Sequence, residues 1–126
     1  MITDHIITYS YRVEGEWAEV FRLDEVFSIE FSCDLSSVPE SVAMVPLLGN
    51  LLPVAWICDA EIVVPVCDQD FFESIPAFRE GYVAMYPTMT FGGKITVGSL
   101  QNNPSGSSKK AGAFFSGGVD AYNTLI

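Results

Sequence analysis

Residues 59–100 decide the fold of this chain and read DAEIVVPVCDQDFFESIPAFREGYVAMYPTMTFGGKITVGSL. The opening run, DAEIVVPV, is rich in β-branched residues and closes at a proline, which is typical of a strand. Residues 69–86 then place aromatic and aliphatic side chains at helical spacing, and Asp68 or Asp70 can cap that helix. A further strand is predicted at 94–100. The aromatic stripe of the helix is expected to be a core face.

Three alternating runs precede this stretch and predict strands at 6–14, 17–23 and 27–32. The first two are expected to form a hairpin that turns at Gly15. Antiparallel strands with one apolar face need a cover on that face.

The segment that follows the third run is expected to supply this cover. Ser37 is a candidate N-cap, and a helix is predicted from there to Leu52. Pro46 is expected to kink this helix or divide it in two, and Pro53 to end it, because proline cannot donate to the preceding turn. The prolines also make the apolar stretch around them too interrupted to predict a membrane span.

The predicted elements together give an α+β domain over residues 1–100, with a small, mostly antiparallel sheet covered by two helices. Residues 101–110, QNNPSGSSKK, have the composition of a polar linker. Residues 111–126 then start a separate unit.

The composition excludes several classes of partner and site. Sixteen acidic and six basic residues give a formal net charge of −10, which disfavours nucleic acids and anionic membranes as partners. Three cysteines without a CxxC pair indicate free thiols and a cytoplasmic location. With a single histidine in the chain, a Cys/His zinc site is not expected.

The last sixteen residues, AGAFFSGGVDAYNTLI, predict a short apolar strand, a glycine turn and the start of a helix. Gly117 and Gly118 let the backbone approach a ligand closely, and amides of the turn can converge on a phosphate. Ser116 adds a hydroxyl donor, and Asp120 could hold a magnesium ion that bridges phosphates. A plain tight turn is the alternative interpretation of the same residues.

The segment FFSGGVDA resembles the SGGxDS signature of the PP-loop ATP pyrophosphatase superfamily, whose α/β enzymes adenylate a substrate and release pyrophosphate. The resemblance implies that Ser116, Gly117, Gly118 and Asp120 bind the phosphates of ATP, with Mg²⁺ as a second cofactor. Ala121 departs from the pattern, since the superfamily usually has serine there. This departure removes one hydroxyl donor to phosphate and puts the catalytic competence of even a complete protein in doubt.

The order of segments along the chain is also similar to uncharacterised bacterial proteins that carry an α+β domain before a PP-loop-like domain. The resemblance implies that residues 1–100 are a non-catalytic accessory domain, with their own downstream nucleotide domain as a partner. Residues 111–126 would hold only the first loop of that domain. This chain is therefore not expected to be active alone, whereas the full protein would be an ATP-dependent adenylating enzyme.

Two other functions are compatible with the sequence. The chain could be a self-sufficient interaction or ligand-binding module, dimeric through its tail, in which SGGVD is only a turn. It could also be an enzyme that uses Glu61, Asp68 and Asp70, but no nucleophile or histidine base accompanies these acids. The tail at 111–126 has three open outcomes: disorder, packing on its own domain, or pairing with another copy.

Overall fold

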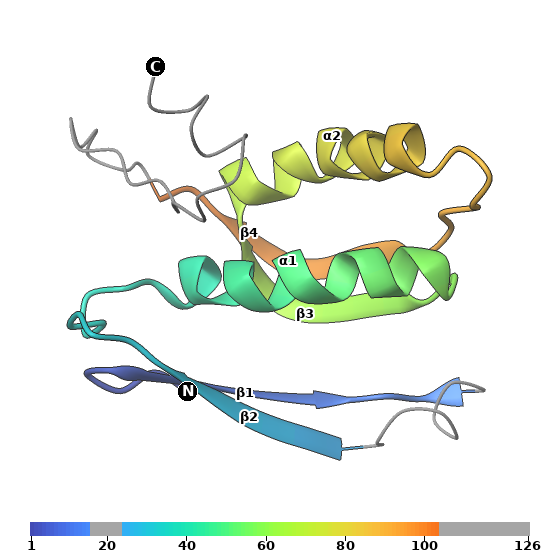
Figure 1. Ribbon diagram of the computed structural model, residues 1–126. Helices are drawn as coiled ribbons and strands as arrows, with labels where there is room; N and C mark the ends of the chain where they lie inside the picture. Colours follow the sequence, from blue (N-terminus) through green and yellow to red (C-terminus); the bar gives the residue numbers. More distant parts are fainter. Residues whose placement is uncertain (16–23, 104–126) are drawn as a thin grey trace, which may run out of the picture.

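The computed structural model describes residues 1–15 and 24–103 and confirms the α+β class (Figure 1). Among these residues the elements alternate between strands and helices after an N-terminal strand pair. They are β1 (Ile6–Arg12), β2 (Asp24–Glu30), α1 (Glu40–Ile57), β3 (Glu61–Asp68), α2 (Gln69–Met85) and β4 (Lys94–Gln101).

The described strands form two separate sheets, whereas the sequence predicted one mostly antiparallel sheet. β1 and β2 pair antiparallel, with Ile6 opposite Glu30. β3 and β4 pair parallel, with Glu61 opposite Lys94, and α2 connects them. The parallel pairing follows from this helical connection, which returns the chain to the same end of the sheet.

The sequence predicts a hairpin between residues 6–14 and 17–23, whereas the described partner of β1 is β2. β1 pairs along its whole length with β2, which covers most of the predicted strand at 27–32. The predicted strand at 17–23 lies outside the described residues.

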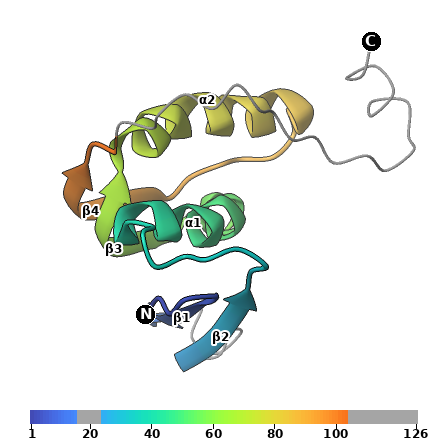
Figure 2. The ribbon, with the colours of Figure 1, turned by 90° about the vertical axis from the view of Figure 1, so that its left-hand side faces the viewer.

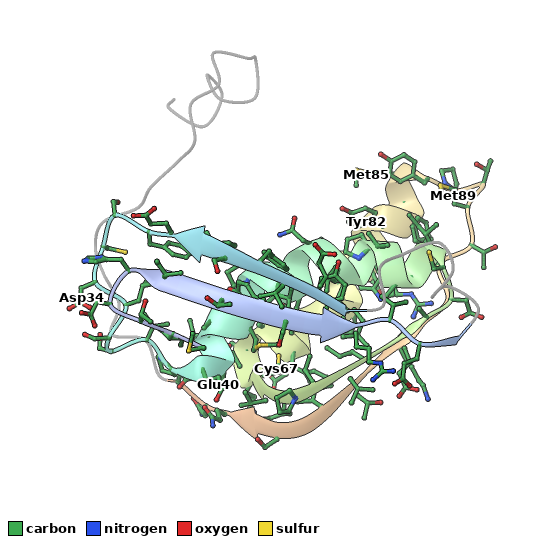
Figure 3. The ribbon with its side chains drawn as sticks, turned by 90° about the horizontal axis from the view of Figure 1, so that it is seen from below. Asp34, Glu40, Cys67, Tyr82, Met85 and Met89 are labelled. Carbon is green, nitrogen blue, oxygen red and sulfur yellow. The ribbon has the colours of Figure 1, made fainter. Side chains whose placement is uncertain are left out.

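Helix α1 separates the two sheets because it is apolar on both sides. Leu48, Leu52 and Trp56 pack into a cluster with β3, α2 and the loop before β4. Ala43 and Leu47 pack into a second cluster with β1. A helix that is hydrophobic all round is a core helix. Figure 3 shows the strand pair β1–β2 in front of α1, so one helix supplies the cores of both sheets.

The predicted start and end of α1 are wrong, and so is its division into two helices at Pro46. The helix begins at Glu40 with Pro39 as N-cap, while Ser37 lies in a preceding turn. It continues unbroken through Pro46 and Pro53 to Ile57. Each interior proline costs roughly 3 kcal/mol, and packing on two faces offsets that cost.

The unbroken helix also corrects the expectation of an interrupted apolar stretch. α1 is long and apolar enough to cross a membrane by length and composition alone. Its contacts with β1 on one side and with β3 on the other account for the same composition in a folded core.

The aromatic stripe of α2 is confirmed as a core face from Phe71 to Tyr82, whereas Val83 and Tyr86 at its end are exposed. The rings of Phe78 and Tyr82 pack edge-on against Trp56, with centroids 5.3 and 6.0 Å from it. The Arg79 guanidinium donates to the carbonyl of Phe91, which ties the loop before β4 to the helix. These contacts fix α2 against α1 and set where β4 begins.

Both described helices lie on the same side of the parallel pair, and Figure 2 shows neither of them on the opposite side. Ile62 and Val64 of β3, with Ile95 and Val97 of β4, belong to the cluster on the helix side. Val63, between two of them, is 70% exposed. The alternation therefore gives the pair one covered and one uncovered face.

Candidate functional site

The residues predicted to bind phosphate lie outside the described residues. Ser116, Gly117, Gly118 and Asp120 all follow Asn103, the last described residue. The structure therefore bears on this site through the place where the chain leaves β4.

That place is the carboxyl end of the parallel pair, where a polar cluster joins three elements. The side-chain amide of Asn103 donates to Asp68 Oδ2 at 2.9 Å and to Ser41 Oγ at 2.8 Å. Ser41 lies in the first turn of α1, and Asp68 lies where β3 ends and α2 begins. We call these three residues the Ser41–Asp68–Asn103 cluster. Ligand sites of α/β proteins form at this end of a parallel sheet.

Asp68 has a second bond that confirms it as the cap of α2. Its Oδ1 accepts from the backbone N–H of Phe71 at 3.0 Å. The bond from Asn103, followed by the bond from Phe71, lowers the pKa of Asp68 below its usual value. The carboxylate is thus held ionised and acts as an acceptor. It also occupies the N-terminus of α2, where an external anion would otherwise bind.

Ser41 is the member of the cluster that the core encloses. It is fully buried, and its hydroxyl oxygen accepts the bond from Asn103. A buried hydroxyl without a partner would be costly, so this bond favours one position for the end of β4. The cluster therefore holds residues 101–103 at a defined starting point for the tail.

Cys67 precedes Asp68 and is fully buried. Its burial, and then the charge of Asp68, raise the pKa of the thiol above its usual value. The thiolate is the nucleophilic form of cysteine, and a raised pKa disfavours it. We therefore interpret Cys67 as a structural residue of the core. No disulfide joins Cys33, Cys58 and Cys67, which all lie in the described part of the chain.

The other two candidate acids do not join the cluster. Glu61 stands at the opposite end of β3, where it accepts from Thr96 at 2.6 Å and pairs with Lys94 at 3.3 Å. The bonds from Thr96 and then Lys94 lower its pKa. At about 3.3 Å per residue, β3 separates Glu61 from Asp68 by roughly 23 Å. Asp70 is exposed in the first turn of α2. The three acids are therefore not one catalytic group.

The described residues contain no cluster of three or more His, Cys, Asp or Glu side chains that could hold a metal ion. Asp120, the predicted magnesium ligand, lies in the tail beyond them. One hollow in the described part has a volume of about 370 Å³ and is bordered by Trp56, Arg79, Val83 and Ile95. It lies toward the amino ends of β3 and β4, away from the cluster.

Sequence reasoning anticipated one member of the cluster and missed two. Asp68 could be recognised from the sequence as a candidate cap, because it directly precedes the helical pattern of residues 69–86. Asn103 belonged to a segment with linker composition, and Ser41 to a helix. Their contacts with each other span 62 residues of sequence, and no local pattern encodes such a contact.

No protein-family model matches this chain, and comparisons with curated proteins and with solved structures find no significant match.

Proposed function

We propose that the α+β body is a non-catalytic accessory domain of a PP-loop-like, ATP-utilising protein. In this proposal Ser116, Gly117, Gly118 and Asp120 form the first phosphate-binding loop, with ATP and Mg²⁺ as cofactors. The observation that carries it is the segment FFSGGVDA, joined by a short polar stretch to the carboxyl end of a parallel strand pair.

Two of the candidate acids of the body already form hydrogen bonds that hold the fold together, which supports a non-catalytic role for the body. Asp68 caps α2 and accepts from Asn103, while Glu61 is bonded to Thr96 and Lys94. Both carboxylates have lowered pKa values, which suits acceptors of hydrogen bonds and not general acids at neutral pH.

Titration calorimetry of the full chain with Mg·ATP tests the proposal. The loop is one part of a nucleotide site, so we expect a Kd of about 1 mM or weaker. In ¹⁵N-labelled chain the amides of residues 116–120 should shift with ATP, and Gly117→Val should abolish those shifts because its side chain blocks the backbone approach. Asp70→Asn, in the exposed first turn of α2, is the matched control and should leave the shifts in place.

Two results would contradict this function. A Kd below about 1 µM for this chain alone would mean that the site is complete here. ATP-dependent shifts that survive Gly117→Val would place binding outside the loop. The accessory role also predicts that tight ATP binding needs a nucleotide domain downstream of the loop.

An interaction module, dimeric or partner-binding, is the second candidate. The uncovered face of β3–β4, with Val63 70% exposed at its centre, favours it. Light scattering after size exclusion separates the two functions. A dimer whose mass is unchanged by Gly117→Val would favour the module, and a monomer at high concentration would favour the accessory domain. Under either function, the acidic charge disfavours nucleic acid as a partner. A cytoplasmic location is part of both proposals.

A further inference from the structure

The uncovered face of the parallel pair is an unusual surface for such a sheet. We call it the bare face. Parallel sheets occur almost only with both faces covered, because the crossover helices and neighbouring strands bury them. Here both helices contact the same face (Figure 2). By the alternation, the exposed side chains on the other face are those of Glu61, Val63 and Pro65 in β3 and of Lys94, Thr96 and Leu100 in β4, beside Gly98.

The bare face is polar at one end and apolar toward the other. Glu61, Lys94 and Thr96 form a bonded group at the amino end of the strands. The next exposed residues of β3 are Val63 and Pro65, and both side chains are apolar. Gly98 lies against Pro65 and leaves that part of the surface without a side chain. On β3 this apolar part ends at Pro65, because Cys67, the next residue in the alternation, is buried in the helix-side cluster, whereas Leu100 of β4 is 45% exposed.

The chain that leaves β4 has the length needed to reach this surface. Residues 104–110 are polar and extend over at most about 25 Å, close to the roughly 26 Å length of β4. Residues 111–126 then bring Phe114, Phe115, Leu125 and Ile126. Covalent linkage keeps their local concentration near the millimolar range.

Charge favours the same contact. The 23 residues after Asn103 contain two lysines and one aspartate, whereas fifteen of the sixteen acids lie at or before Glu80. Both lysines, Lys109 and Lys110, lie directly before residues 111–126, and the body is strongly acidic, so this linker is attracted to the body at low ionic strength.

We propose that residues 111–126 dock on the bare face of β3–β4 within the same chain and cover Val63 and Pro65. The contact would cover the second face of the parallel strand pair. It does not require phosphate binding by the SGGVD segment, so it stands or falls separately from the proposed function.

Hydrogen exchange of the full chain without nucleotide tests this docking. A synthetic peptide of residues 104–126 gives the reference rates. Docking predicts amides in 111–126 that exchange about tenfold more slowly than in the peptide. Val63→Lys places a charge on the bare face and should return the tail to the reference rates. Val26→Lys is the matched control, since Val26 is 65% exposed on β2 and lies on the other sheet.

Three outcomes would overturn the proposal. The tail could exchange at peptide rates in the native chain, or its protection could survive Val63→Lys. Protection that rises with protein concentration, together with a doubled mass in light scattering, would identify a second copy as the occupant. Exchange in α2 should be unchanged in both variants, which verifies that the body remains folded.

Discussion

The two sheets of this protein share one helix but differ in what they require from the rest of the chain. In the described part of the chain, the antiparallel pair β1–β2 packs one face against α1 and exposes the other, where Val26 is 65% exposed, as is common for antiparallel sheets. The parallel pair β3–β4 has both described helices on one face and neither of them on the other. Among the described residues, one uncovered face is therefore ordinary for the antiparallel pair, whereas the parallel pair exposes surface that parallel sheets normally bury.

The largest expected effect comes from the core that serves the parallel pair. Leu48 is fully buried in the cluster with β3 and α2. Leu48→Ala should lower the free energy of unfolding by about 3–5 kcal/mol, because it removes apolar contacts and leaves a cavity. Urea denaturation followed by circular dichroism measures the loss.

Leu47→Ala is the matched variant on the other side of α1, in the cluster with β1. It should cost about 2–3 kcal/mol and accelerate hydrogen exchange chiefly in β1 and β2. Equal acceleration in β3 would mean that the two sheets open as one unit.

The next effect concerns the hydrogen bond that fastens β1 to α1. Tyr9 is buried, and its hydroxyl donates to the carbonyl of Ala43 at 2.6 Å. Tyr9→Phe should cost about 1–2 kcal/mol because the buried carbonyl loses this donor. Tyr11→Phe, on the same strand but less buried, is the control. Similar midpoints for the two variants in urea would contradict a role of this bond in joining the sheet to the helix.

A smaller effect is expected at the carboxyl end of the parallel pair. Asp68→Ala removes the cap of α2 and the partner of Asn103, and should cost about 1 kcal/mol. The pKa of Asp68 is lowered in the folded protein, so its stabilisation is present above the usual pKa and is lost as the pH falls below about 4.

Thermal unfolding between pH 7 and pH 3 measures this dependence. The variant should lose less stability than the native chain over the acidic part of that range. An unchanged difference between the two proteins at every pH would show that the charge of Asp68 contributes nothing.

The smallest effect is expected at the amino end of the same strand. Glu61 pairs with Lys94 on an exposed surface, and such pairs contribute little. Glu61→Gln should leave the melting temperature at pH 7 unchanged within error. A clear loss would mean that this end of the bare face is more tightly ordered than its exposure indicates.

Much of the body could be predicted from sequence because its signals are local. Local patterns indicate which face of a segment is buried. Examples are the alternation of IITYSYR, the β-branched run of β3 and the aromatic spacing of α2. The cap at Asp68 was also predictable, since a cap and its helix are adjacent in sequence. The boundaries of α1 were not predictable in this way, because Pro46 and Pro53 oppose a helix locally.

The α+β class, the acidic charge and the segment that resembles a phosphate-binding loop follow from the amino-acid sequence without the fold. The division of the strands into two sheets, and the unbroken course of α1 between them, follow from tertiary packing. It also brought Ser41, Asp68 and Asn103 together at the end of β4. The physical reason is that periodicity records which side of a segment is buried, while the partner that buries it is chosen by packing between distant segments.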